Sequence, residues 1–470
     1  MMELVSPAGN VEKLAYAWEY GADAAYVGLK RFSLRVKADN FHDDEYLQIR
    51  DLKAAYAAAG KPKRLFCALN ISFHDRDIDH FLEEADYFRQ YPFDAFIIQD
   101  PGMIAVLGRE FPGVPLHLST QANCINGEAA KFYRSLGFKR VVLGREASLD
   151  DIKRIKDAAP ELELECFAHG AMCIAYSGRC LMSAYMTGRS ANAGHCSHSC
   201  RWDWRLNRGS ETAAFATEEL RAGGEDDADY AVEERARPGE YYPVIEGDGF
   251  TALFSSKDLC MIDYLAEMKK AGADSLKIEG RMKSLYYAAV VTRAYRKRID
   301  ALEGRIPAGA DEPFVAELEN VAHRAFTTGF YLSPDAANET TKGETAAPWQ
   351  LAGTIGTERT VRAESATGEQ TLATPEGWRD FEFHSMNKMD AGTAVEFVGP
   401  DVASIADPEC LLLDPETGEE RPWVSHGHPC LIRTRSPIAP RWIVRMRDPG
   451  KHAAAVEAST DASRIPRTMR

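Results

Sequence analysis

The sequence lacks the features of several large protein classes. No apolar run approaches the roughly 20 residues that a membrane-spanning helix requires, and the first residues lack the basic and then apolar pattern of a secretory signal peptide. Positive charge is also scarce, because 56 Lys and Arg face 71 Asp and Glu, for a formal net charge of -15. We therefore expect a cytoplasmic protein without a membrane partner, in which any nucleic acid is bound at a local basic patch.

Several common catalytic motifs are missing as well. The sequence contains no G-x-x-x-x-G-K-[ST] phosphate loop, no G-x-G-x-x-G dinucleotide fingerprint, no H-E-x-x-H zinc helix and no G-x-S-x-G nucleophile elbow. ATP hydrolysis, Rossmann redox chemistry and the common proteolytic mechanisms therefore lack support from motifs.

Short apolar or β-branched runs alternate with helix-like stretches along the first two thirds of the chain. The runs are 3–6, 24–28, 64–71, 95–99, 116–121, 140–143, 164–168 and 275–279, and the clearest helical stretches are 10–20, 151–159, 284–303 and 312–324. Alternation of this kind is typical of a parallel sheet covered by helices. Eight strand–helix units predict an α/β fold with a closed (β/α)8 TIM-like barrel.

The spacing of these runs and the later composition predict the domain organisation. A TIM-like catalytic domain is expected at 1–332, with a cysteine-bearing insertion at 166–260 before the last strand. Within the insertion, the acidic stretch 211–234 is typical of a solvated loop. Beyond the barrel we expect a linker at 333–347, a small all-β domain at 348–447 and a flexible tail at 448–470. The short alternating runs of the β domain predict a small β-barrel.

Four of the ten cysteines fall in one short segment, with the spacing Cys173-x6-Cys180-x15-Cys196-x3-Cys200. Glycine-bearing loops between them can turn four thiolates toward one metal centre. Zinc sites usually pair close cysteines twice, whereas the wide first pair here favours a bulkier 4Fe-4S cluster. From spacing alone, zinc and unrelated buried or redox-active cysteines stay open as alternatives.

Polar residues recur at the carboxyl ends of the expected strands, where barrel enzymes place their active sites. Those with a candidate role are Asn70, Gln121, Asn123, His169, Lys277, Glu279, Arg281 and Lys283, and the pair Arg145-Glu146 also lies at a strand end. Such a ring suits a polar, anionic small molecule, and Lys257, beside Asp258, adds a further cation. His169 is a candidate proton donor or neighbour of a cluster sulfur, although a lone His is more often structural.

Two basic stretches are candidate nucleic-acid surfaces. One lies on the helix after the last barrel strand, at Arg293, Arg296, Lys297 and Arg298, and the other lies in the β domain, between Arg433 and Arg447. The alternative for both is an ordinary solvated or packing surface.

Several segments resemble one known family. Residues 165–183 (ECFAHGAMCIAYSGRCLMS) are similar to the signature of peptidase family U-32, the collagenase-like proteases, and so are 3–9 (ELVSPAG), 119–123 (STQAN) and 276–281 (LKIEGR). The stretch 194–202 (GHCSHSCRW) and the extra β domain are most similar to the tRNA-hydroxylating branch of this family. The resemblance covers roughly residues 1–335, and the β domain matches only loosely.

The resemblance implies oxygen-independent hydroxylation of the wobble uridine of tRNA to 5-hydroxyuridine, with prephenate or a similar small dicarboxylate as hydroxyl donor. It also implies a 4Fe-4S cluster on Cys173, Cys180, Cys196 and Cys200. We further expect His169, Glu279 and Asp258 to be catalytic. The expected substrate-binding residues are Arg35, Asn70, Gln121, Asn123, Tyr176, Lys257, Lys277, Arg281 and Lys283, with Tyr176 or Phe167 available to stack on the base.

Two other functions are consistent with the family. The first is a collagenase-like peptidase, although the sequence shows no recognisable nucleophile–base pair. The second is a subunit that hydroxylates the ubiquinone ring, but relatives with that role are shorter and lack a β extension.

Overall fold

The computed structural model describes most of the chain. The described residues are 1–29, 32–33, 41, 44–173, 175–187, 189–198, 200, 230–233, 241–247, 250–252, 256–333, 347–359, 362–365, 368–371 and 374–447. Arg35, the tail 448–470 and nearly all of the acidic stretch 211–234 and the linker 333–347 lie outside this part. Their predicted roles stay predictions.

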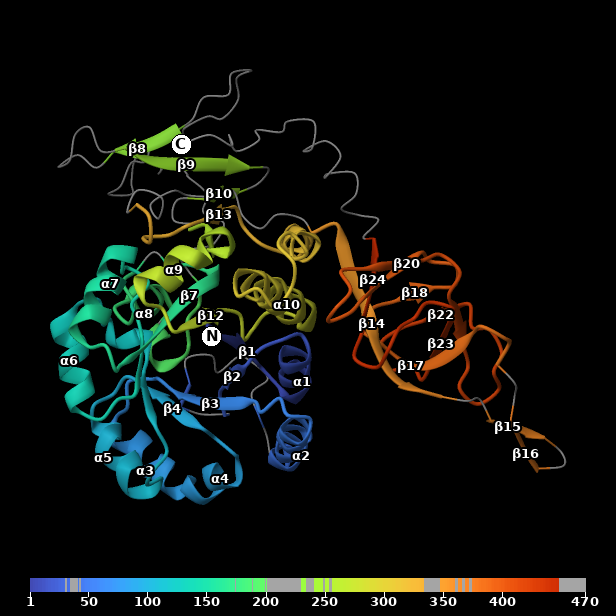
Figure 1. Ribbon diagram of the computed structural model, residues 1–470, viewed down its shortest axis with the longest axis horizontal. Helices are drawn as coiled ribbons and strands as arrows, with labels where there is room; N and C mark the ends of the chain where they lie inside the picture. The colour runs from blue at the N-terminus through green and yellow to red at the C-terminus, as the bar shows by residue number, and fades with distance from the viewer. Residues whose placement is uncertain are drawn as a thin grey trace, which may run out of the picture.

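Eight parallel strands close into a barrel (Figure 1). They are β1 (Glu3–Pro7), β2 (Ala24–Val27), β3 (Arg64–Leu69), β4 (Ala95–Ile98), β5 (Leu116–Leu118), β6 (Arg140–Val142), β7 (Glu163–Ala171) and β12 (Ser275–Ile278). Each pairs in parallel with the next, and β12 pairs with both β1 and β7. The predicted TIM-like barrel and all eight of its strands are confirmed.

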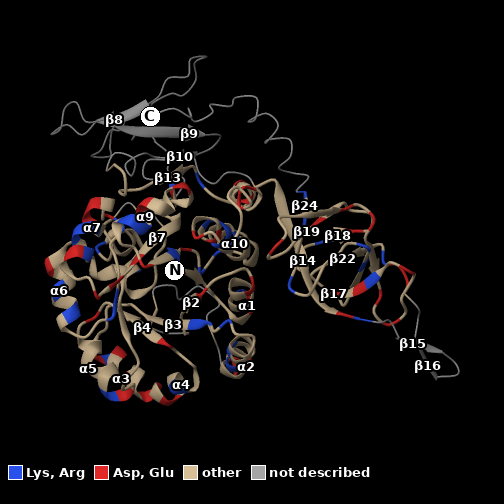
Figure 2. Ribbon diagram, in the orientation of Figure 1, with Lys and Arg blue, Asp and Glu red and all other residues tan. Residues whose placement is uncertain are grey.

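Helices surround the barrel and carry charge on their outer faces, as α6 and α7 show in Figure 2. They are α1 (Val11–Glu19), α2 (Glu45–Ala58), α3 (Asp75–Glu83), α4 (Ala85–Gln90), α5 (Gly102–Glu110), α6 (Gly127–Ser135), α7 (Leu149–Ala158), α9 (Leu265–Ala271) and α10 (Leu285–Leu302). Asn10 caps α1 by accepting from the Lys13 amide at 2.9 Å. No helix in the described part of the chain is both long and apolar enough to cross a bilayer.

Two expected helices have different bounds in the structure. The helix predicted from residue 151 begins at Leu149, because Ser148 and Asp151 form a capping box. The helix predicted over 312–324 is only α11 (Glu312–Val315), followed by a 3-10 turn at Ala316–Asn320.

The segment between β7 and β12 adds short elements to the barrel. Strand β11 (Asp258–Cys260) runs antiparallel to β7 and parallel to β13 (Phe326–Thr327), which extends the sheet outside the closed barrel. Helix α8 (Met182–Thr187) lies within the cysteine segment, and β8 (Tyr230–Glu233), β9 (Tyr241–Gly247) and β10 (Phe250–Ala252) form a separate sheet.

The C-terminal domain is a curled antiparallel sheet, in keeping with the expected small all-β domain. Its strands pair in the order β20 (Ile405–Asp407), β19 (Val395–Val398), β24 (Ile443–Arg447), β14 (Trp349–Glu358), β17 (Arg379–Ser385), β23 (Leu431–Thr434) and β21 (Leu411–Leu413). Two further strand pairs are β15 (Arg362–Ser365) with β16 (Gly368–Thr371) and β18 (Met389–Asp390) with β22 (Trp423–Val424).

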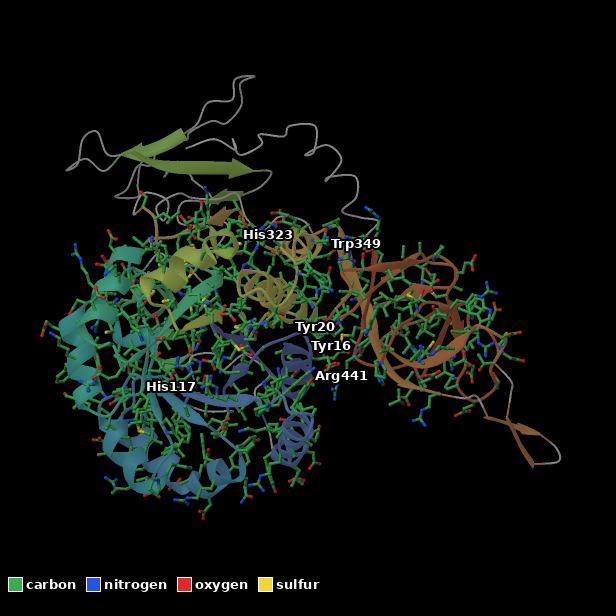
Figure 3. The ribbon with its side chains drawn as sticks, in the orientation of Figure 1. Tyr16, Tyr20, His117, His323, Trp349 and Arg441 are labelled. Carbon is green, nitrogen blue, oxygen red and sulfur yellow. The ribbon has the colours of Figure 1, made fainter. Side chains whose placement is uncertain are left out.

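This sheet packs against α1 and α10, and the labelled Tyr16, Tyr20 and Arg441 mark the junction in Figure 3. The hydroxyl of Tyr20 donates to Val398 O at 2.8 Å. Arg293 of α10 is fully buried and donates to Gly399 O at 2.6 Å and Val402 O at 2.7 Å.

The first candidate nucleic-acid surface, on α10, is divided between the domain interface and ion pairs of the barrel domain, where Arg296 pairs with Asp23 and Arg298 with Asp311, each at 3.0 Å. Arg293 is buried in the interface, and Lys297 pairs with Asp401 of the β domain at 2.5 Å. The second candidate is also divided among ion pairs, since Arg433 pairs with Asp380 at 2.6 Å and the buried Arg445 bonds Glu317. In both stretches, part of the positive charge is thus paired within the protein.

Candidate active site

Two cavities lie at the carboxyl ends of the barrel strands, one above the other. The inner cavity, of about 70 Å³, is lined by Tyr26, Ala68, Asn70, Ile97, Ser119, Thr120, Gln121, Val142, Arg145, Phe167, Lys277, Glu279 and Arg281. The outer cavity has a volume of about 330 Å³. Thr120, Gln121, Arg145 and Glu279 line both, so the two cavities adjoin one another. This is the end of a barrel at which enzymes of this architecture bind substrate.

All four clustered cysteines line the outer cavity. Cys173 is exposed, and Cys180, Cys196 and Cys200 are partly exposed. Among the other cysteines, Cys67, Cys124, Cys166, Cys410 and Cys430 are buried. Cys260 is partly exposed but lines neither cavity, so the segment after β7 brings to the outer cavity the other four cysteines that are not buried.

These thiols match the donor set of an iron–sulfur cluster or a zinc ion. In the described part of the chain, no three Cys, His, Asp or Glu side chains lie close enough to one another to hold a metal ion. The four cysteines therefore have the donor atoms that the predicted metal centre needs, and they line the same cavity. Metal ligation itself stays a prediction.

The cysteine segment is docked onto the ends of three barrel strands. After β6, the Glu146 carboxylate accepts from the Ser177 amide at 2.7 Å. After β5, Gly178 packs on Gln121, and a Cβ at Gly178 would lie 2.0 Å from the Gln121 carbonyl oxygen. Since Gly178 also has φ +77°, this position requires glycine. After β3, the Ser72 amide donates to Asn192 O at 3.1 Å.

Cations converge on the inner cavity. The Arg281 guanidinium is buried and donates to the Ser33 hydroxyl at 2.6 Å. Arg145 donates to Ala171 O at 2.6 Å and lies 4.0 Å over the Phe167 ring. Lys277 Nζ is 4.2 Å from the Tyr26 ring centroid. These fixed positions suit an anionic group better than an apolar one.

Below the inner cavity, the N-terminal end of the barrel is filled by buried charges. Glu165 accepts from Lys277 at 2.6 Å and from Arg140 at 2.7 Å. Burial alone raises the pKa of Glu165, but Lys277 and Arg140 outweigh it and hold the pKa at about 2. Burial lowers the pKa of Lys277, and Glu165 opposes that effect. Lys277 therefore contacts the cavity while already paired with a carboxylate.

Most of the predicted site residues lie in these cavities. Asn70, Gln121, Lys277, Glu279 and Arg281 line the inner cavity, and Gln121, Tyr176, Glu279 and Lys283 line the outer one with the cysteines. Asn123 lies beside them, with its amide 3.5 Å from Glu146.

The remaining predicted residues lie elsewhere in the described chain. His169 lines neither cavity and is buried, with Nδ1 3.3 Å from the Tyr295 hydroxyl. Burial lowers the pKa of His169 to about 3. Asp258 is a buried partner of Arg324, whose Nε donates to it at 3.0 Å. Lys257, next to Asp258, is partly exposed. The geometry gives no support to proton transfer by His169 or Asp258.

Three contributors to the site carried no predicted role. Arg145 and Glu146 stand at a strand end in the sequence, and the structure shows that Arg145 lines both cavities while Glu146 anchors the cysteine segment. Thr120 donates to Leu143 O at 3.0 Å and also lines both cavities. Its position inside the run STQAN is the only sequence signal for it.

The chain is similar to several proteins of known sequence. It is 39% identical over 345 residues to tRNA hydroxylation protein P of Escherichia coli, covering 70% of this chain and 74% of that protein. It is 32% identical to the 23S rRNA 5-hydroxycytidine C2501 synthase of Escherichia coli, over 70% of this chain and 45% of that protein. It is 29% identical to a collagenase of Porphyromonas gingivalis, over 70% of this chain and 73% of that protein.

The family profile spans the cysteine segment and all of the barrel except β1. The profile of Peptidase family U32 matches residues 9–341, which contain both cavities and all four clustered cysteines. On this match and on its similarity to the Escherichia coli tRNA hydroxylation protein, the chain belongs to peptidase family U32.

Proposed function

We propose that this protein is an RNA-modifying enzyme that hydroxylates the wobble uridine of tRNA to 5-hydroxyuridine without using oxygen. Two relatives support RNA hydroxylation, one named for tRNA and one for rRNA. The observation that carries the proposal is the convergence of four exposed or partly exposed cysteines on a cavity that adjoins a polar, cationic chamber. RNA binding alone would not need that thiol set.

The proposed cofactor is a 4Fe-4S cluster held by Cys173, Cys180, Cys196 and Cys200, with zinc as the alternative metal. Because four cysteines would ligate all four irons, such a cluster would supply electron-transfer chemistry beside the substrate rather than an open Lewis-acid site. The chain's own contribution is positioning. Glu146 and Gly178 fix the cysteine segment over the chamber. A base that enters the outer cavity would therefore lie between the four cysteines and the cations of the inner cavity.

Arg281 and Lys283 are proposed to bind the hydroxyl donor, a small dicarboxylate such as prephenate. Arg281 is oriented by Ser33, and Lys283 lines the outer cavity above it. A guanidinium can donate two parallel hydrogen bonds to one carboxylate. The target uridine, flipped out of the RNA, would occupy the outer cavity with Tyr176 at its wall.

The decisive experiment is anaerobic purification followed by iron and zinc counting and an absorption spectrum near 400 nm. Cys180→Ser should lose iron and the absorption band, whereas Cys260→Ser should keep both, because Cys260 lies on β11 outside the cavity. A colourless protein loaded with zinc, or equal iron in the two variants, would contradict the cluster.

The reaction is tested by incubating the anaerobic protein with unmodified tRNA and prephenate, and then measuring 5-hydroxyuridine by mass spectrometry. Product should form with prephenate and not without a donor. Arg281→Met should raise the KM for prephenate more than it lowers kcat, since Arg281 is assigned to ground-state binding. Product formed at the same rate with no added donor would rule out prephenate.

Peptidase activity is the alternative favoured by one relative, the collagenase. Casein or gelatin cleavage by the same anaerobic preparation, lost in Cys180→Ser, would support it. Absence of cleavage with formation of 5-hydroxyuridine would support the hydroxylase.

A further inference from the structure

The rim of the outer cavity carries a concentration of exposed apolar side chains. Tyr176 and Met282 line the cavity, and Leu181, Tyr185 and Met186 lie on or directly before α8. Tyr185 is 88% exposed and Leu181 is 72% exposed. Exposed apolar side chains gathered at one place mark an interaction site, whereas single ones are ordinary. We call these five residues the α8 rim.

Helix α8 is fixed beside the cysteines with Tyr185 turned outward. The buried Ser183 hydroxyl donates to Arg189 O at 2.7 Å and accepts from the Ser197 amide at 2.9 Å, next to Cys196. Residues two apart on a helix point in nearly opposite directions, because each residue turns the helix by about 100°. Holding Ser183 inward therefore presents the Tyr185 ring to solvent, on a helix bonded to the residue that follows Cys196 of the cavity wall.

The segment that carries α8 has charge of one sign, whereas Glu146 and Glu279 from neighbouring strand ends also line the outer cavity. The chain has 71 Asp and Glu, yet the sequence from Cys166 to Trp202 contains none of them. On the same segment Arg179 and Arg189 are exposed, and Arg145 lines the cavity. Apolar side chains alone would be enough to bind a protein or a lipid partner. The missing carboxylates instead favour a polyanion with flat apolar groups, which describes unpaired RNA.

We propose that the α8 rim binds the unpaired nucleotides that flank the target base, with Tyr185 stacking on a neighbouring base. Arg179 and Arg189 bind the phosphates of the same nucleotides. This inference rests on the proposed RNA substrate and adds the surface that holds the loop while one base enters the cavity. It predicts that the enzyme prefers single-stranded loops over duplexes.

The test compares Tyr185→Ala and Tyr185→Phe with the control Phe132→Ala, using full-length protein purified anaerobically. Phe132 is 58% exposed on α6 and lines neither cavity, so it matches Tyr185 in exposed apolar character. The probes are an unmodified anticodon stem–loop RNA and a fully paired RNA duplex. Tyr185→Ala should raise the Kd for the stem–loop about tenfold, the loss expected for one stacked base. Tyr185→Phe and Phe132→Ala should bind within about twofold of wild type.

Other outcomes separate this inference from the proposed function. If the wild type hydroxylates tRNA and Tyr185→Ala binds the stem–loop with an unchanged Kd, the inference is overturned and the proposed function stands. An equal loss of duplex and stem–loop binding would also overturn it, because duplex bases cannot stack on Tyr185. Altered self-association without altered RNA binding would identify a protein interface instead. Failure of the wild type to bind or modify RNA would overturn both. Since Tyr185 is exposed and alanine favours helix, the variant is expected to fold.

Discussion

The two ends of the barrel interior use similar charged side chains in different settings. At the N-terminal end, Arg140 is buried and bonds Glu163 at 2.6 Å and Glu165 at 2.7 Å. At the C-terminal end, Arg145 and Lys283 line open cavities. The first set is held by carboxylates of the barrel itself, whereas the second set faces space that a ligand can fill. Charge at the closed end therefore serves the fold, and charge at the open end is available for binding.

The cysteines divide in a similar way. Burial raises the pKa of Cys124 to about 11 and that of Cys410 to about 12, which keeps these thiols protonated and inert. The four clustered cysteines lie at the cavity and are at least partly exposed. Only a thiol that can reach a ligand and lose its proton can hold a metal, so location separates the two groups.

The strongest test of this comparison removes the central cation of the closed end. Arg140→Met should lower the free energy of unfolding by about 3–5 kcal/mol, because it leaves buried carboxylates without a partner. Urea denaturation measures the change. The control is Arg134→Met, which breaks a surface pair with Glu161 and should cost about 0–1 kcal/mol. Equal losses in the two variants would show that the closed end is no more dependent on charge pairing than the surface.

A smaller effect is expected from the histidine at the closed end. Burial, followed by the nearby Arg140, lowers the pKa of His117 to about 3. An unfolded histidine has a pKa of about 6.5, so between pH 6.5 and 3 the unfolded chain binds a proton that the folded chain does not. His117 therefore reduces stability as the pH falls through this window.

His117→Phe removes this proton uptake. On going from pH 7 to pH 5, the variant should lose about 2 kcal/mol less of its unfolding free energy than the wild type, the equivalent of 1.5 pH units. Urea denaturation at the two pH values measures the difference. Identical losses in the two proteins would mean that His117 titrates normally and that the closed end admits water. At pH 7, the comparison also reports any change in packing against Phe66, whose ring centroid is 4.8 Å away.

Sequence patterns predicted the barrel because each strand is a short apolar run followed by an amphipathic helix. They also predicted that most of the candidate site residues lie together, since strand ends meet at one rim in a parallel barrel. The docking of the cysteine segment was not visible in the sequence. It depends on the contact of Glu146 with Ser177 and on the close approach of Gly178 to Gln121.

The orientation of His169 shows why strand alternation alone misplaces a residue. In β7, Glu165 and Phe167 face the barrel interior, so a period of two would turn His169 inward as well. The register with β12 shifts there, because Lys277 pairs with Phe167 but Ile278 pairs with His169. This irregularity puts an extra residue in β7 and turns His169 outward, against Tyr295 of α10. Asp258 likewise pairs with Arg324, a distant contact that spacing cannot reveal.

The smallest expected effect on stability comes from the open end. Lys283 is partly exposed and lies 5.5 Å from the Tyr287 ring centroid, a contact worth about 0.5–1 kcal/mol at such a site. Lys283→Gln should therefore lower the unfolding free energy by no more than about 1 kcal/mol. Its rate of 5-hydroxyuridine formation at low prephenate should still fall roughly tenfold, because one charge-assisted hydrogen bond to the donor is lost. A loss of stability as large as that of Arg140→Met, or an unchanged rate, would show that Lys283 belongs to the fold and remove the distinction between the two ends.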